Sequence, residues 1–195
     1  MKIKEVKFLK SVFIDDDRVL LDEHKEIVFI WRSNVGKSSI MNSLFNKKDL
    51  VKTSSKPGKT KTANIFLLNN KYYFTDLPGY WFAKLWKEFL EKLDWLISWY
   101  LEVRAPYIRK VCILIDSRIW LQQKDKDMFL YVQELWLPIN IILSKSDKLG
   151  SWQLEKVKKQ IEQELFWQQI FAVSSLKKTG IKELFRNLSE ALEEK

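Results

Sequence analysis

Glycine, cysteine and histidine are all scarce in this sequence. Of 195 residues, 5 are glycine, while cysteine and histidine occur once each, as Cys112 and His24. A single cysteine cannot form a disulfide within the chain, so we expect a reducing compartment, and its apolar neighbours predict a buried core thiol. His24 lies in a charged stretch and cannot build a metal site alone. The sequence therefore excludes a disulfide framework.

Long apolar segments are missing as well. No run of about 18 apolar residues is present, so no helix is expected to span a membrane. The first residues, Met1 to Glu5, lack the apolar segment of a signal peptide. These two absences predict a cytoplasmic protein.

Basic residues exceed acidic ones. The chain has 34 Lys and Arg against 25 Asp and Glu, which gives a net charge of +9. A basic surface attracts polyanions such as RNA, or an anionic membrane face. No arginine-rich tail or compact basic block marks one binding patch, so a generally solvated basic surface fits the charge equally well.

Apolar runs alternate with amphipathic stretches along a chain whose length fits one domain. The Asn69-Asn70 pair is typical of a hairpin turn. The first 20 residues should add a strand or an arm to the fold. The composition of residues 52–62 predicts a mobile loop. The expected strands are Glu26–Ile30, Ala63–Leu68, Tyr72–Thr75, Lys110–Asp116, Pro138–Ser144 and Gln169–Val173, and the expected helices are 37–45, 84–104, 124–135, 151–165 and 180–193. This alternation predicts an α/β fold over residues 21–195, with a mostly parallel sheet and helices on both faces.

The segment Trp31 to Ser38 matches the phosphate-loop pattern G-x-x-x-x-G-K-[ST] except at its first glycine. It follows a buried strand and opens a helix, as the pattern requires. Backbone N–H groups and a helix N-terminus would face the phosphates. Lys37 would place its charge between the β- and γ-phosphates, and the Ser38 hydroxyl would bind Mg²⁺. The predicted loop also includes Ser33, Asn34, Val35, Gly36 and Ser39. Taken alone, the alternative is a chance Gly-Lys-Ser-Ser at a helix start.

A second motif, Asp76-Leu77-Pro78-Gly79, follows the strand that ends near Thr75. A carboxylate at a strand end can hold magnesium through water, and the N–H of Gly79 can approach the γ-phosphate. In isolation this pattern is also a common turn.

Two further segments follow later strands. Asp147, in Ser144-Lys145-Ser146-Asp147, can accept two hydrogen bonds from the guanine N1–H and N2–H₂ edge, which would select GTP over ATP. The stem of Lys145 can cover the base, and backbone N–H groups of Ser174-Ser175 can meet the guanine O6. Each segment alone could be a polar turn. Together with the two earlier motifs they stand in GTPase order at strand ends, where ligands bind in open α/β sheets.

These residues make the chain resemble the EngB/YihA/YsxC family of bacterial ribosome-biogenesis GTPases. The resemblance covers about Glu26 to Glu190, and it implies that Thr60, near Gly58, is the switch threonine that binds Mg²⁺ when the γ-phosphate is present. It also implies a monomer that matures the large ribosomal subunit, binds its precursor and rRNA rather than DNA, and is needed for normal septation. The residues that carry it are Arg32 to Ser39, Ser54 to Thr60, Asp76 to Tyr80 with Phe82-Ala83-Lys84, and Ser144 to Asp147.

Tryptophan stands at four positions where glycine is expected: Trp31, Trp81, Trp120 and Trp136. Such positions often need positive φ or close backbone approach, at a cost of about 1–3 kcal/mol for a bulky residue. They could be real tryptophans packing a lineage-specific surface. Our preferred hypothesis is that many are glycine codons read as tryptophan, as in a lineage that uses UGA for glycine. The 9 Trp and 5 Gly together make about 7.2% of 195 residues, near the usual glycine share of about 7%.

The predicted reaction is hydrolysis of GTP to GDP and phosphate, through positioning and charge neutralisation by Lys37, Thr60 and Gly79. Tyr80 replaces the glutamine that orients water in many G domains, so intrinsic turnover should be slow. Asn34 either stabilises the loop backbone or helps to hold K⁺ beside the phosphates. The rival function is a nucleotide-dependent binding module with negligible hydrolysis, which Trp31 favours if its side chain obstructs the phosphates. Asp147 argues against an ATPase.

Overall fold

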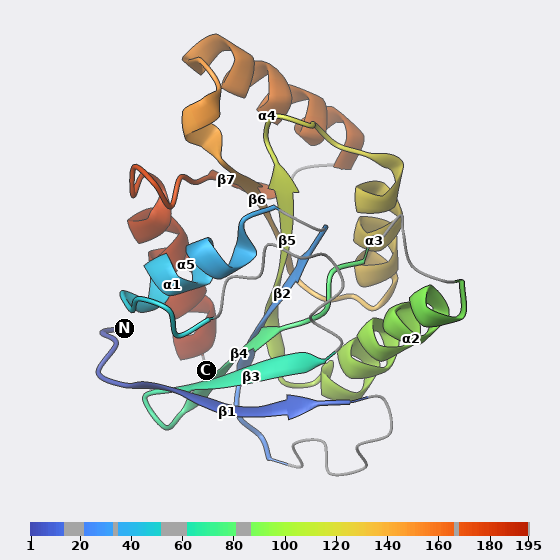
Figure 1. The fold of residues 1–195 in the computed structure, drawn as a ribbon, viewed down its shortest axis with the longest axis vertical. Coiled ribbons are helices and arrows are strands. Elements are labelled where there is room, and N and C mark those ends of the chain that lie inside the picture. The colour runs from blue at the N-terminus through green and yellow to red at the C-terminus, as the bar shows by residue number, and fades with distance from the viewer. Residues whose placement is uncertain (14–21, 33–34, 52–61, 81–86, 166–167, 195) are drawn as a thin grey trace.

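The computed structural model describes residues 1–13, 22–32, 35–51, 62–80, 87–165 and 168–194. Strands and helices alternate along most of the chain (Figure 1). The elements are β1 (Val6–Val12), β2 (Glu26–Trp31), α1 (Lys37–Phe45), β3 (Ala63–Leu68), β4 (Tyr72–Asp76), α2 (Lys87–Arg104), β5 (Ile108–Asp116), α3 (Gln123–Glu134), β6 (Ile139–Ser144), the 3₁₀ turn η1 (Ser146–Lys148), α4 (Ser151–Leu165), β7 (Gln169–Ala172) and α5 (Ile181–Glu193).

One seven-stranded sheet organises the molecule, in the order β1-β3-β4-β2-β5-β6-β7. The pairs β2–β4, β2–β5, β5–β6 and β6–β7 are parallel, and β3 runs antiparallel to both β1 and β4. The predicted α/β fold with a mostly parallel sheet is therefore confirmed. Because β4, β2, β5, β6 and β7 are parallel, their carboxyl ends meet at one edge of the sheet.

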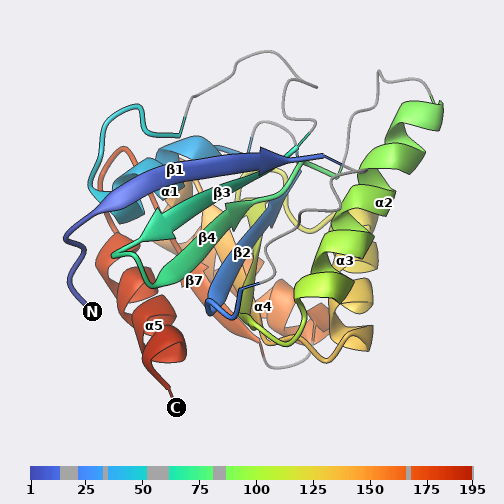
Figure 2. The same cartoon turned by 90° about the horizontal axis from the view of Figure 1, so that it is seen from below.

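Helices cover both faces of this sheet, with α1 and α5 on one side and α2 and α3 on the other (Figure 2). All six residues of β2 are buried. Val28 and Ile30 join a core with side chains of α2, α3 and α4, whereas Ile27, Phe29 and Trp31 join a core with α1 and α5. Burial on both faces explains why β2 reads as a continuous apolar run rather than an alternating one.

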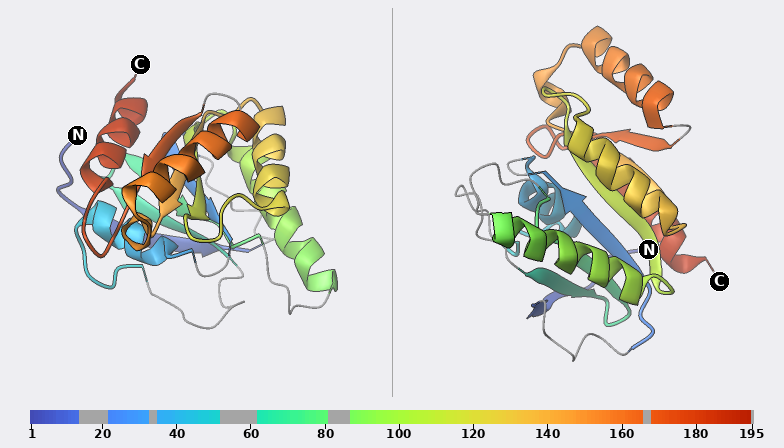
Figure 3. Two further views of the ribbon diagram at one scale, coloured as in Figure 1. Left: turned by 90° about the horizontal axis from the view of Figure 1, so that it is seen from above. Right: turned by 90° about the vertical axis from the view of Figure 1, so that its right-hand side faces the viewer.

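The helices α2 and α3 lie beside each other on their face of the sheet (Figure 3). The Tyr131 hydroxyl of α3 donates a hydrogen bond to Glu102 of α2 at 2.8 Å. Of the expected helix over 84–104, residues 84–86 lie outside the described ranges. None of the described helices is long and apolar enough to cross a membrane.

The hairpin between β3 and β4 turns at Asn69 and Asn70, as the sequence predicts. Both residues have φ of 52°, and the N–H of Lys71 donates to the carbonyl of Leu68 at 3.0 Å. Asparagine tolerates this left-handed conformation better than most residues do. The Asn69 side chain also accepts hydrogen bonds from the N–H groups of Lys4 and Glu5. The turn therefore holds the segment that leads into β1.

Of the two possibilities for the first 20 residues, a strand or an arm, the structure has a strand, β1, over Val6–Val12. It pairs antiparallel with β3 and shifts register between Phe8 and Lys10. The boundary at residue 20 stays a prediction. Of the expected mobile loop, residues 52–61 lie outside the described ranges.

Two of the four unexpected tryptophans have the left-handed backbone that their positions predicted. Trp120 has φ of 65° and Trp136 has φ of 57°. Trp136 follows the C-cap of α3, its N–H donates to the carbonyl of Gln133 at 2.9 Å, and the residue is 93% exposed. An indole that projects into solvent packs nothing, so Trp136 supports the glycine hypothesis rather than a packed surface. Trp81 lies outside the described residues.

A buried ion pair anchors the amino end of β2. Glu26 and Arg104 are 0% and 1% exposed, and Arg104 Nε donates to Glu26 Oε2 at 2.9 Å. The hydroxyls of Tyr100 and Thr75 donate to the other oxygen of Glu26. Because both charges are paired and hydrogen-bonded, the pair is tolerated inside the core and ties α2 to the sheet.

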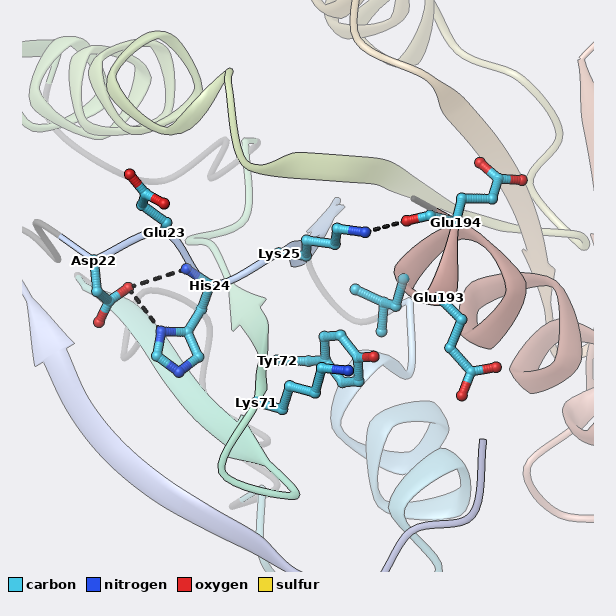
Figure 4. Close-up of a pocket in the computed structure, with 9 residues that line it drawn as sticks. Asp22, Glu23, His24, Lys25, Lys71, Tyr72, Glu193 and Glu194 are labelled. Carbon is cyan, nitrogen blue, oxygen red and sulfur yellow. Dashed lines mark hydrogen bonds and ion pairs between the residues drawn. The ribbon is translucent and has the colours of Figure 1, made fainter.

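A cavity of about 600 Å³ opens at the same end of the sheet (Figure 4). His24 lies against Asp22 there, with 3.2 Å between Nδ1 and Oδ1, while Lys25 donates to the carbonyl of Glu194. The cavity is lined by Asp22, Glu23, His24, Lys25, Lys71, Tyr72, Leu192, Glu193 and Glu194. It lies where β2 and β4 begin, which places it opposite the edge that carries the sequence motifs.

Candidate functional site

The phosphate loop leads from β2 into α1. Gly36 has φ of 95° and ψ of 21° and caps the N-terminus of α1. A side chain would be strained in this left-handed conformation, so glycine is required here. The first turn of α1 then starts at Lys37 and includes Ser38 and Ser39. Val35 is buried beneath the loop. This arrangement gives the predicted helix N-terminus at the carboxyl edge of the sheet, where the N–H groups of its first turn can face a phosphate.

Lys37 meets Asp76 at this edge. The two side chains form a buried ion pair between α1 and the end of β4, with exposed fractions of 7% for Lys37 and 1% for Asp76. Burial raises the pKa of Asp76 to about 6, against the lowering effect of the Lys37 ammonium. Asp76 Oδ1 has no hydrogen-bond partner among the described residues. A buried carboxylate oxygen without a donor is suited to a ligand.

Gly79 lies directly against Trp31. The N–H of Tyr80 donates to the carbonyl of Trp31 at 3.0 Å. A methyl group on Gly79 would lie 3.1 Å from Trp31 Nε1 and 3.2 Å from its carbonyl oxygen, so only glycine fits without a shift. The centre of the Trp31 ring also lies 4.0 Å from the Lys37 ammonium. The indole is therefore next to two groups that were predicted to face the phosphates.

Tyr80 is held away from any catalytic position. Its hydroxyl donates to Asp125 Oδ1 at 2.7 Å in the interior, and burial together with this carboxylate raises its pKa well above the ordinary value. Asp125 also accepts from the N–H of Gln122 in the capping box of α3. Arg32 Nη1 lies 3.8 Å from the same carboxylate. The Tyr80 ring thus fastens the Asp-x-x-Gly loop to α3.

The side chain of Lys145 lies close to Gly36 of the phosphate loop. Its Cε would lie 3.6 Å from a methyl group on Gly36, and its ammonium is 2.9 Å from Asp116 Oδ2 at the end of β5. Arg118 also donates to this carboxylate at 2.7 Å. Burial alone would raise the pKa of Asp116, but the hydrogen bonds from Arg118 and Lys145 lower it to about 2. Asp116 therefore stays charged and holds the Lys145 stem in place.

Asp147 and Ser174 are brought together from two loops. The Ser174 hydroxyl donates to Asp147 Oδ1 at 2.6 Å, and this bond lowers the pKa of the carboxyl. The hydroxyl also accepts the N–H of Lys177 at 3.0 Å. The N–H of Ser146 donates to the carbonyl of Val173 at 3.2 Å, which joins the loops themselves. Ser175 follows as a half-buried residue. These contacts keep the Asp147 carboxylate ionised and fixed.

The structure places most of the predicted site residues at one edge of the sheet. The exceptions are Ser33, Asn34, Gly58 and Thr60, which lie outside the described residues. Sequence reasoning missed Asp116 as the residue that holds Lys145, although its place at the end of a buried strand was a usable signal. The partnership of Tyr80 with Asp125 had no such signal, because 45 residues separate them.

This fold and these motifs define a P-loop GTP-binding domain. A family model described as "50S ribosome-binding GTPase" matches residues 26–145. A probable GTP-binding protein EngB from Kosmotoga olearia is 40% identical over 191 residues, covering 96% of this chain and 99% of the relative. One from Clostridioides difficile is 39% identical over 192 residues, covering 96% and 93%. The chain belongs to the EngB family of GTP-binding proteins, and it is a GTPase.

Solved structures show the same fold. A probable GTP-binding protein engB superposes with a TM-score of 0.74 at 22% identity, over 87% of this chain and all of that one. Era in complex with MgGDPNP and nucleotides 1506–1542 of 16S ribosomal RNA superposes with a TM-score of 0.69 at 21% identity, over 88% of this chain and 57% of that one.

Proposed function

We propose that the chain binds GTP with Mg²⁺ at this edge of the sheet, hydrolyses it slowly to GDP and phosphate, and acts in assembly of the large ribosomal subunit. The observation that carries the proposal is the meeting of Lys37 with Asp76 and of Lys145 with Gly36 at one edge. These two contacts bring together three motifs that are distant in sequence, and the bond between Ser174 and Asp147 adds the fourth. A role in normal septation follows from the family resemblance.

The nucleotide would lie along this surface with its base at the Asp147 end. The ionised Asp147 would accept from the guanine N1–H and N2–H₂ groups, and the Lys145 stem would cover one face of the ring. The N-terminus of α1 and the Lys37 ammonium would hold the phosphates. Since each group is fixed by neighbours before the nucleotide arrives, little ordering is needed on binding.

Magnesium fits the oxygen groups beside Lys37. The half-buried Ser38 lies in the first turn of α1, and Asp76 carries the unpartnered Oδ1. Hard oxygen ligands of this kind suit Mg²⁺, which is usually held by one or two protein groups together with phosphate and water. In the described part of the chain no three acidic, cysteine or histidine side chains gather into a metal cluster. When bound, the ion would neutralise charge on the phosphates. Thr60 is the proposed further ligand.

Hydrolysis would rest on positioning rather than on a general base. The Tyr80 hydroxyl is occupied by Asp125, so the residue after Gly79 has no group to orient water. Lys37 and the N–H of Gly79 would stabilise charge on the terminal phosphate, with Thr60 beside them. Slow turnover is expected without a partner or a further ion such as K⁺.

The proposed partner is the precursor of the large ribosomal subunit through its rRNA. The net charge of +9 favours a polyanion, the matching family model is described as ribosome-binding, and the Era structure holds a segment of ribosomal RNA. We propose that the chain acts as a cytoplasmic monomer on this particle.

A second function has one observation in its favour. The Trp31 ring contacts Lys37 and lies close against Gly79, where it would hinder the terminal phosphate. A nucleotide-dependent binding module with negligible hydrolysis would tolerate such an obstruction better than an enzyme would.

The test is titration of the purified protein with GDP, GTP and ATP by calorimetry, combined with a phosphate-release assay in Mg²⁺. Guanine nucleotides should bind and ATP should not, and phosphate should appear slowly. The variant Asp127→Asn changes an exposed carboxylate of α3 that is remote from the site. It is the matched control for the same substitution at Asp147 and should bind nucleotides as the parent does. Equal binding of ATP and GTP would overturn the proposed site, and guanine binding without phosphate release in the presence of ribosomal particles would favour the binding module.

A further inference from the structure

Trp31 contacts both Lys37 and the Asp-x-x-Gly loop. The Lys37 ammonium lies 4.0 Å from the centre of the indole ring. A methyl group on Gly79 would be 3.1 Å from Nε1 of the same indole and 3.4 Å from its Cδ1. The indole is thus in contact with the ammonium and lies close against Gly79.

The terminal phosphate of a nucleoside triphosphate would have to meet the same two groups. The lysine of a phosphate loop reaches the β- and γ-phosphates, and the N–H at the Gly79 position would face the γ-phosphate. A side chain that contacts both Lys37 and Gly79 therefore competes with the γ-phosphate more than with the rest of the nucleotide. At the proposed base end, Asp147 and Ser174 bond to each other and to the N–H of Lys177.

We propose that the indole at position 31, in a protein that carries tryptophan rather than glycine there, occupies the terminal-phosphate subsite and favours nucleoside diphosphate over triphosphate. The inference rests on the proposed nucleotide site and names the residue that sets its phosphate specificity. Glycine at position 31 would leave the volume of the indole to the phosphate.

Moving the indole out of this position would cost free energy, because the side chain is buried. Trp31 is 7% exposed and belongs to the buried cluster that includes Val35 and the inner face of α1. Its place at the end of β2 follows the alternation of that strand, in which Ile27 and Phe29 face the same core. Displacement would expose apolar surface and break the contact between ammonium and ring. Binding of a triphosphate requires this displacement, which lowers its affinity. A diphosphate does not extend to Gly79, so it displaces the indole less and loses less affinity.

The experiment measures the affinity of GDP and of a non-hydrolysable GTP analogue, both with Mg²⁺, for the parent, Trp31→Gly and Trp31→Phe. Trp31→Gly should raise the ratio of analogue to GDP affinity by at least about tenfold. Trp31→Phe keeps an aromatic ring in the core and should give an intermediate ratio, which guards against loss of fold in the glycine variant. Trp136→Gly makes the same substitution at an exposed site just after α3 and should leave the ratio at the parent value.

An unchanged ratio in both Trp31 variants, with GDP still bound, would overturn this inference and leave the proposed function intact. Binding of the analogue by the parent as tightly as GDP would do the same. Failure of the parent and of all three variants to bind any guanine nucleotide would instead overturn the proposed function and this inference with it.

Discussion

Asp147, the residue proposed to recognise the base, carries a carboxyl whose pKa is lowered by its bond to Ser174. Its side chain is 5% exposed, and the Ser174 hydroxyl engages Oδ1. Both oxygens keep lone pairs that a guanine edge can use, since each carboxylate oxygen accepts about two hydrogen bonds. An amide at this position would present one acceptor and one donor.

Asp147→Asn is therefore expected to weaken GTP binding by at least about 100-fold, because a donor would then face the donors of guanine. The preference should shift toward xanthine nucleotides, which offer a carbonyl where guanine has its amino group. Competition between GTP and XTP against a labelled nucleotide checks this. If the variant kept the parent's order of preference, Asp147 would not be the base-reading residue.

Trp136 is a residue whose backbone conflicts with its side chain. Trp136→Gly should raise the free energy of unfolding by about 1 kcal/mol, because φ of 57° is strained for tryptophan and natural for glycine. Little packing is lost, since the residue is 93% exposed. Urea denaturation followed by circular dichroism measures the change. Trp152→Gly, at an exposed position inside α4, is the control and should lower stability by a few tenths to about 1 kcal/mol.

The coding DNA checks the glycine hypothesis independently. UGA codons at positions 31 and 81 are what the hypothesis expects. UGG codons at both positions would contradict it.

At the scale of elements, the ion pair between Glu26 and Arg104 joins β2 to α2. Arg104→Met should destabilise the protein by about 3–5 kcal/mol, because it leaves the Glu26 carboxylate buried without its cation. Arg186→Met, on the exposed side of α5, is the matched control and should change stability by no more than about 0.5 kcal/mol. Chemical denaturation measures the free energy of unfolding of both variants. If Arg104→Met lowered it by no more than the control does, the ion pair would not have this stabilising role.

The loop that follows Gly79 bears on how fast GTP is hydrolysed. With Tyr80 tied to Asp125, we expect slow turnover that rises with K⁺ over Na⁺, or on addition of ribosomal particles. Asn34→Ala should remove the response to K⁺ and leave GDP binding largely intact. Phosphate release measured in each salt tests this. Fast hydrolysis in Na⁺ alone, without any partner, would show that Tyr80 in place of glutamine does not make intrinsic turnover slow.

The elements were more predictable than the contacts between them. The expected strand over Ala63–Leu68 and the helices at 37–45 and 151–165 agree with β3, α1 and α4 residue for residue, because apolar periodicity and turn residues are local signals. The convergence of Lys37 and Asp76 was predictable as well, since parallel strands bring their carboxyl ends together. Side-chain partners such as Asp116 for Lys145 depend on long-range packing, which no local pattern records. The same holds for the indole of Trp31 beside Gly79.

For the whole molecule, the surplus of positive charge predicts how the partner is held. Binding to large-subunit precursor particles should be stronger with GTP than with GDP, and raising salt from 50 to 200 mM should weaken it by at least about tenfold, since counterions are released from phosphates. Co-sedimentation at several salt concentrations measures both effects. Association that ignored both nucleotide and salt would count against an rRNA partner.

The two edges of the sheet limit how copies of the protein can meet each other. β1 and β7 are the outermost strands, and the outer backbone of an edge strand is a template on which another chain can add a strand. β7 is four residues long, and β1 carries the exposed Lys7 beside its register shift between Phe8 and Lys10. Short, irregular and lysine-bearing edges disfavour such addition. Concentrated solutions of the folded protein are therefore expected to stay free of amyloid-like fibrils.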